Sequence, residues 1–250
     1  MRRAIRLEFR KMRRLRTFLI TAILVLAVAG LSSFSLFAGS TQESFNDPDA
    51  MPWAGLMVTY TLMAAMTSPI LAAVLASRQT DIEHSGVGWT LASTAGYSPG
   101  VLCRAKLVAL STVLLPAVVV QSLLVIGMGL FAGIRVPLDP GPWVLYTGLL
   151  FLIDVVFLAL HIWLAAIVEN QLVSVGVGML GAFLGVFTLL TSTAVARVIP
   201  WGYYAMISPI GQQGDSLVYL TPPFGWIAGF LILVGIVFAV ATRRLDRIER

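Results

Sequence analysis

The sequence has few of the residues on which enzymes and disulfide-linked proteins depend. Only 12% of its 250 residues are charged, and it holds one cysteine, Cys103, and two histidines. A single cysteine excludes a disulfide within the chain. No Gly-Lys dipeptide occurs, which excludes a phosphate-binding P-loop. No Ser/His/Asp set and no paired carboxylates stand out, so we predict no catalytic residues, no metal and no cofactor on this chain.

Long apolar runs are what the sequence has in abundance. Six of them have lengths between 18 and 26 residues, against the roughly 20 that a helix needs to span a bilayer. Only the fourth contains a charged residue, Asp154. The runs are residues 18–37, 54–76, 107–131, 143–168, 172–190 and 224–241. Because lipid offers the backbone no hydrogen-bond partners, we predict an all-α integral membrane protein with six transmembrane helices.

The distribution of basic residues predicts the topology. Eight Lys or Arg precede Phe18, three lie in residues 77–106 and four follow Ala241. Loops on the opposite side hold two basic residues, Arg135 and Arg197. The same loops hold five acids: Glu43, Asp47, Asp49, Asp139 and Asp215. Since basic loops stay in the cytosol, we expect a multi-pass protein of the bacterial plasma membrane with both termini cytoplasmic. The net charge of +5 then indicates contact with anionic inner-leaflet lipids rather than with nucleic acid.

Residues 1–17 have the pattern of an amphipathic interfacial helix. Ile5, Phe9 and Met12 share one helical face. The arginines lie largely on the opposite face, as in helices that rest on a membrane surface. We therefore divide the chain into this helix and a transmembrane domain over residues 18–250.

Two of the connections between the apolar runs carry more apolar side chains than a simple linker needs. Residues 77–106 should form one or two short helices, broken at Gly86–Gly88 and Gly96–Pro99, that dock on a partner or on the protein's own underside. Residues 200–209 concentrate aromatics, which predicts anchoring at the outer membrane interface, with a gate above a substrate path as the alternative.

The fourth run places two polar side chains within the membrane. His161 follows Asp154 by seven residues on the same helical face, about 10 Å along the axis. A buried acid must pair, face water or be protonated. These residues either line a translocation path or make packing hydrogen bonds, for example to Gln121 or Thr188. One acid and one histidine do not make a metal site.

Small residues gather in the fifth run. Gly181 and Gly185 have the G-x-x-x-G spacing that lets two helices approach closely. They are candidates for the seam of a dimer, and internal packing is the alternative.

The loop over residues 77–106 contains Glu83-His84, Trp89, a break at residues 97–99 and Arg104-Ala105-Lys106. With these features it resembles the first cytoplasmic loop of ABC-2-type exporter permeases. The Glu-His…Trp pattern is similar to that of the lantibiotic-immunity (bacteriocin-protection) permease family. This chain departs from that family where Ser98-Pro99-Gly100 replaces a Pro, Ser and basic residue.

The resemblance implies a permease subunit that moves an antimicrobial peptide, drug or other amphiphile. It implies a second permease, identical or homologous, and two separate ATP-binding cassette subunits that carry ATP and magnesium. The loop would then couple to the ATPase through Asp81, Glu83, His84 and Trp89. Two alternatives stay open: an embedded enzyme or interaction subunit that uses Asp154 and His161, and a small secondary transporter.

Overall fold

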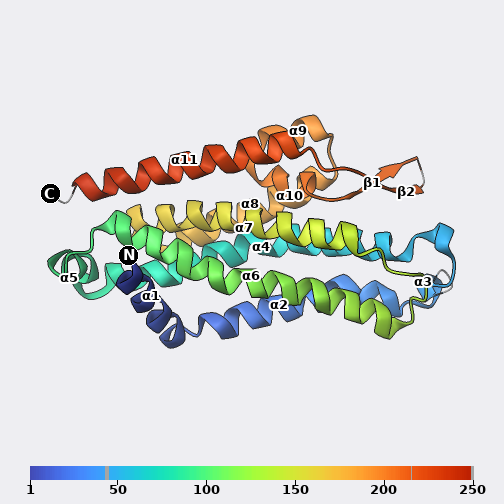
Figure 1. Cartoon of the computed structure of the whole chain (residues 1–250), viewed down its shortest axis with the longest axis horizontal. Coiled ribbons are helices and arrows are strands. Elements are labelled where there is room, and N and C mark those ends of the chain that lie inside the picture. The colour runs from blue at the N-terminus through green and yellow to red at the C-terminus, as the bar shows by residue number, and fades with distance from the viewer. Residues whose placement is uncertain (43–44, 215, 249–250) are drawn as a thin grey trace.

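The computed structural model describes residues 1–42, 45–214 and 216–248. Glu43 and Asp215, two of the acids used to predict the topology, lie outside the described residues. Within the described part, six helices are long and apolar enough to cross a membrane. They lie roughly side by side along the long axis of the molecule (Figure 1). The prediction of an all-α membrane protein is confirmed.

Each predicted run overlaps a membrane-length helix, and the fourth and fifth runs extend one residue past the helix end. The helices are α2 (Thr17–Ser33), α4 (Pro52–His84), α6 (Pro99–Ala132), α7 (Pro140–Ile167), α8 (Gln171–Leu189) and α11 (Phe224–Ile248). A short 3₁₀ helix, η1 (Phe34–Phe37), extends α2. Helices α4 and α6 continue past their apolar runs, the first for eight residues after Ala76 and the second from eight residues before Leu107. At 33 residues, α4 is about 50 Å long, well above the roughly 30 Å of bilayer hydrocarbon.

One end of the bundle carries helix α1 (Arg2–Arg14), helix α5 (Gly88–Thr94) and the C-terminal end of α11 (Figure 1). We call it the basal end. The 3₁₀ turn η3 (Ser85–Val87) separates α4 from α5, and α5 ends before Pro99. Both breaks fall where the glycines and proline predicted them. At the opposite end lie α3 (Gly39–Gln42) and the 3₁₀ turn η2 (Pro48–Ala50).

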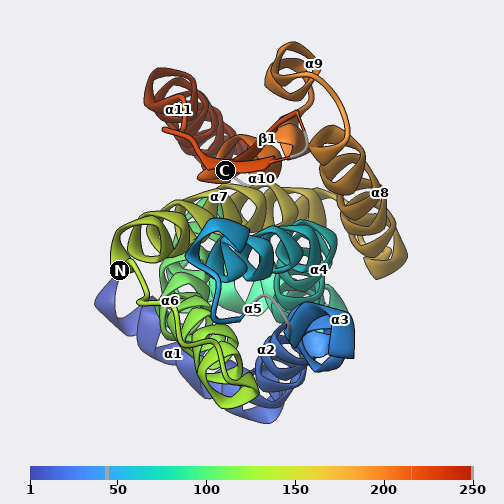
Figure 2. The ribbon, with the colours of Figure 1, turned by 90° about the vertical axis from the view of Figure 1, so that its right-hand side faces the viewer.

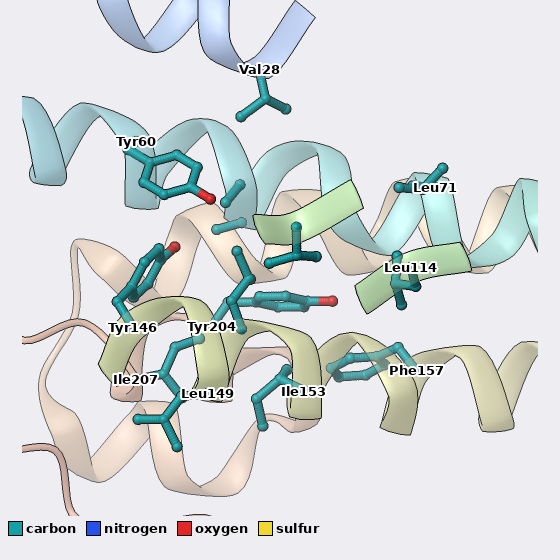
Figure 3. Packing of buried hydrophobic residues seen from close by; sticks show 14 of the residues in the cluster. Val28, Tyr60, Leu71, Leu114, Tyr146, Leu149, Ile153, Phe157, Tyr204 and Ile207 are labelled. Carbon is teal, nitrogen blue, oxygen red and sulfur yellow. The ribbon is translucent and has the colours of Figure 1, made fainter. Parts of the chain in front are cut away.

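Helix α4 is the centre of the bundle. It contacts α2, α6, α7 and α8, and Figure 2 shows these helices around it. Large buried side chains fill the space between α4, α6 and α7 (Figure 3). Tyr60 of α4 and Tyr146 of α7 meet there edge to face, with 5.3 Å between ring centroids. The Tyr60 hydroxyl bonds to Ser122 of α6 at 2.9 Å, so the aromatic core is also hydrogen-bonded.

The chain between α8 and α11 is not a simple connection. It forms α9 (Thr193–Val198), η4 (Pro200–Gly202), α10 (Tyr203–Met206) and two short antiparallel strands, β1 (Ile210–Gln213) and β2 (Ser216–Tyr219). The strands pair from Ile210 with Tyr219 to Gln213 with Ser216. Helix α10 sits against the bundle beside α7, as Figure 2 shows.

The aromatics of residues 200–209 are therefore packed inside, which corrects the prediction of an interface anchor. Tyr204 is 1% exposed and stacks on Phe157 of α7 with 5.3 Å between ring centroids. Tyr203 stacks on Phe230 of α11. The aromatic ring of a tyrosine can be buried in the core, rather than lie at the depth of the lipid headgroups, when a polar group inside the protein bonds to its hydroxyl. Asp154 supplies that partner to Tyr204.

Candidate functional site

Four charged side chains meet at the basal end, where α1, α4 and α6 converge. The ammonium group of Lys106, which is fully buried, lies 2.9 Å from Glu8 Oε2 and 2.5 Å from Glu83 Oε1. Lys11 approaches both acids as well, at 2.7 Å from each. We call these residues, Glu8, Lys11, Glu83 and Lys106, the charge cluster. Its two acids and two lysines balance.

Hydrogen bonds complete the charge cluster. Lys106 donates to the backbone oxygen of Gln79 at 2.9 Å, and the Gln79 amide donates to Glu8 Oε2 at 2.7 Å. Burial raises the pKa of Glu8, but the positive charges of Lys106 and Lys11 outweigh it and hold the pKa below the ordinary 4.5. Burial lowers the pKa of Lys11, and the charge of Glu8 reverses this to a net increase above 10.5.

The charge cluster fixes α1 to the ends of α4 and α6. Buried charges are costly to desolvate, so such a cluster tolerates few alternative arrangements of its helices. On α1, the face that meets the bundle is formed by Ala4, Glu8 and Met12, each fully buried. All seven arginines of residues 1–16 are exposed. Helix α1 and the base of α4 therefore form one connected unit.

The short helix α5 rests on this unit. Gly88 begins α5 so close to α4 that a Cβ there would lie 2.8 Å from the Cα of Glu83. The Trp89 indole donates to His84 Nδ1 at 3.4 Å, and the two rings meet edge to face. His84 Nε2 lies 2.7 Å from the backbone oxygen of Ala165, at the basal end of α7. The position of α5 is thus determined by α4 and α7.

Two large apolar side chains are open to solvent at α5, Val87 just before the helix and Leu91 within it. Val87 is 68% exposed and Leu91 is 63% exposed. Val87 also has a left-handed backbone with φ of 58°, which is rare for a β-branched residue and marks local strain. A hollow of about 240 Å³ lies beside α5, lined by His84, Trp89 and Glu169 among others. Exposed apolar residues next to a polar hollow are typical of a surface that receives a partner.

The structure divides the loop residues singled out in the sequence into two groups. Glu83 is buried in the charge cluster, and His84 and Trp89 support α5 from within. Asp81 is half-buried near the end of α4. The side chains that a partner would meet first are Val87 and Leu91, which are among the apolar residues that predicted docking of this loop but not among the four coupling residues. The sequence reasoning missed Glu8, whose signal is that it is the only acid in the basic stretch of residues 1–17.

Asp154 is buried and satisfied by neighbours. The Tyr204 hydroxyl donates to its Oδ1 at 2.8 Å, and the Ser68 hydroxyl of α4 lies 3.4 Å from its Oδ2. The suggested partners, Gln121 and Thr188, are engaged elsewhere, with Tyr60 and with the Gly185 oxygen. Asp154 therefore ties α10 to α7 and α4.

His161 lies on the same helix as Asp154 but contacts a different neighbouring helix. Its Nδ1 is 3.1 Å from the Ser174 hydroxyl of α8, while its fully buried Nε2 has no hydrogen-bond partner in the described part of the chain. Nowhere in residues 1–42, 45–214 and 216–248 do three His, Cys, Asp or Glu side chains gather closely enough to hold a metal ion.

Gly181 and Gly185 face the interior of their own chain. A Cβ on Gly181 would collide with the Trp201 indole, and one on Gly185 would lie 3.1 Å from the Ala65 oxygen of α4. Both glycines are buried. The close approach that the spacing predicts is thus made within the chain, and a second copy would have to meet another face.

Comparison with known proteins agrees with the helical layout. A family model described as "ABC-2 family transporter protein" matches residues 4–185, which include all but the first two residues of α1, the charge cluster, α5 and both glycines. No curated protein matches the chain.

Proposed function

Because the chain belongs to the ABC-2 transporter family, we propose that it is the membrane-spanning permease of an ATP-driven exporter. ABC-2 permeases partner with an ATP-binding subunit, so ATP and magnesium are expected there and not on this chain. The proposed cargo is an antimicrobial peptide, a drug or another amphiphile, as the likeness of the loop to lantibiotic-immunity permeases suggests.

The observation that carries this proposal is the architecture of α5. A short helix packs closely on α4, with the apolar side chains of Leu91 and of Val87 just before it exposed. A partner that presses on Val87 and Leu91 would move the end of α4, to which the charge cluster attaches α1 and α6. Since α4 runs through the centre of the bundle, a displacement of its base would reach most of the membrane helices.

We place the basal end in the cytoplasm. It carries α1, Arg78, Arg104 and the basic end of α11, and basic residues near helix ends are retained on that side. An ATP-binding subunit would then meet α5 from the cytosol. We expect one six-helix chain to supply only half of the transport path, so that two permease copies or homologues form the path between them.

The geometry of the site favours neither of the two alternatives, an embedded enzyme or interaction subunit and a small secondary transporter. Asp154 makes structural hydrogen bonds with Tyr204 and Ser68, and neither a second acid nor a histidine is among its described partners. Pro69 of α4 and Pro116 of α6 lie within continuous helices, whereas secondary transporters bind ions at broken ones.

The test is reconstitution in liposomes with an ATP-binding subunit sought in the reading frames next to this one. ATP should drive a fluorescent cationic antimicrobial peptide across the membrane only when both proteins are present. As a control, an ATP-binding subunit with its Walker lysine replaced should leave the peptide where it is. Transport by the permease alone, or no stable association with the ATP-binding subunit, would contradict the proposal.

A further inference from the structure

A groove of about 340 Å³ runs between α2 and α6 on the surface that faces lipid. One wall is formed by Phe18, Ala22 and Leu26, and the other by Val113, Ala117 and Val120. Thr21, the one polar residue in the lining, already donates its hydroxyl to the Thr17 oxygen at 2.9 Å. The groove therefore presents only hydrocarbon to a guest.

The groove has the depth of one membrane leaflet. Phe18 is the second residue of α2 and Leu26 is eight residues further, which corresponds to about 12 Å along the helix. Half of the roughly 30 Å of bilayer hydrocarbon is about 15 Å. A chain that enters at the basal end and fills the groove would thus stop near the bilayer centre, as one acyl chain does.

Positive charge lies at the mouth of the groove. Arg13, Arg14 and Arg16 are exposed and are within five residues of Phe18. In the described part of the chain, none of the three forms an ion pair, because Glu8 is occupied by the two lysines of the charge cluster. Arginine forms bidentate hydrogen bonds with phosphate oxygens, so unpaired guanidinium groups are good ligands for a lipid headgroup.

The corner that carries these arginines is held in place. The charge cluster fixes α1, and the Arg78 guanidinium donates to the Leu15 oxygen at 3.4 Å. Arg16 turns the chain into α2 with a left-handed φ of 55°. The cations and the groove thus have a defined relative position.

We propose that the groove and the α1–α2 corner form a binding site for one anionic phospholipid. An acyl chain lies in the groove, and the phosphate lies on Arg13, Arg14 and Arg16. In the proposed topology this lipid belongs to the inner leaflet. A second copy of the chain fits less well, because a twofold contact would bring two sets of seven exposed arginines together.

The test compares dioleoyl phosphatidylglycerol with dioleoyl phosphatidylcholine, which have identical acyl chains. The full chain in detergent is mixed with each lipid, and native mass spectrometry measures the fraction that retains one lipid. We expect several-fold greater retention of phosphatidylglycerol. Equal retention of both lipids by the unmodified chain would overturn the proposal.

Variants separate the groove from the headgroup contacts. Ala117→Phe fills the groove and should abolish retention, whereas Val119→Phe, on the exposed side of the same helix, should not. Arg→Gln at positions 13, 14 and 16 should each lower the preference for phosphatidylglycerol by up to about fivefold, since one basic residue near an anionic surface contributes about 1 kcal/mol.

Two outcomes would overturn the site. One is equal retention of the lipid by Ala117→Phe and Val119→Phe. If Ala117→Phe does not fold, Ala22→Phe on the opposite wall of the groove takes its place. The other is loss of a dimer in Ala117→Phe with lipid retention unchanged, which would show that the groove holds a second copy.

Discussion

Lys106 and Glu83 form the closest ion pair of the charge cluster, with 2.5 Å between Nζ and Oε1 and almost no exposure of either side chain. The pair joins the end of α4, about one turn before α5, to the base of α6. Glu83, which the sequence suggested as a contact for the ATPase, thus supports the helix that we propose as the contact.

Removing the charge of Lys106 should destabilise the protein strongly. Lys106→Met leaves Glu8 and Glu83 buried with one cation between them, and breaking such a pair costs about 3–5 kcal/mol. Arg104→Gln is the matched control, because its pair with Asp246 is partly exposed and should contribute about 1 kcal/mol or less. The free energy of unfolding in mixed micelles measures both.

The effect of Glu83→Gln on the stability of the protein should change sign when Lys106 is replaced. Glu83→Gln alone leaves excess positive charge and should destabilise the protein, whereas in the Lys106→Met background it restores neutrality and should stabilise. A double-mutant cycle reports this coupling. Additive effects of the two changes would show that the charge cluster is not one unit.

Stability should depend on pH through Glu8. Its folded pKa lies below the unfolded value of 4.5, so its contribution is complete above pH 4.5 and is lost as the pH falls through the folded pKa. Lys11, with a raised pKa, contributes fully below pH 10.5 and less as the pH rises through its folded value. As the pH is lowered, the thermal unfolding temperature of Glu8→Gln should fall less steeply than that of the unmodified chain. Equal slopes for the two proteins would contradict this assignment.

The fifth membrane helix offers a direct test of which glycines are packed. Gly181→Ala forces a Cβ against Trp201 and should cost about 1–3 kcal/mol. Gly176→Ala, on the same helix with open space around it, should be neutral or stabilise by up to about 1 kcal/mol. If both variants are equally stable and only Gly181→Ala loses a dimer, the glycine forms a seam between chains after all.

Asp154 should act as a hydrogen-bond acceptor rather than as a charged transport residue. Asp154→Asn keeps an oxygen for Tyr204 and should retain folding and transport. Asp154→Ala leaves the buried Tyr204 hydroxyl unpaired at a cost of about 1–3 kcal/mol. Transport assays beside unfolding curves distinguish the roles, since loss of transport in a stable Asp154→Asn would indicate a path residue.

How much was predictable from sequence differs between the membrane helices and their ends. Length and polarity alone locate all six spans, because lipid imposes both. They do not predict that α4 continues to His84, since Arg78, Asp81 and Glu83 end the apolar pattern without ending the helix. The charge cluster joins residues 98 positions apart, and no local pattern encodes such a contact.

The aromatic segment shows a second limit. Tyr204 has the composition of an interface residue, and only the presence of Asp154 at the right place in α7 explains its burial. For the same reason the spacing of Gly181 and Gly185 predicted close packing correctly but could not say which helix or chain supplies the partner.

The most direct measurement of the central claim is the amount of ATP-binding subunit that co-purifies with the tagged permease. Leu91→Ser removes an exposed apolar side chain from α5, and Val198→Ser does the same at the end of α9, remote from the basal end. If α5 is the docking surface, Leu91→Ser should reduce the co-purified subunit by at least about fivefold, since an interface anchor contributes more than about 1 kcal/mol. Val198→Ser should retain the full amount. Equal amounts with both variants would contradict the assignment of α5 as the site where ATP hydrolysis is coupled to transport.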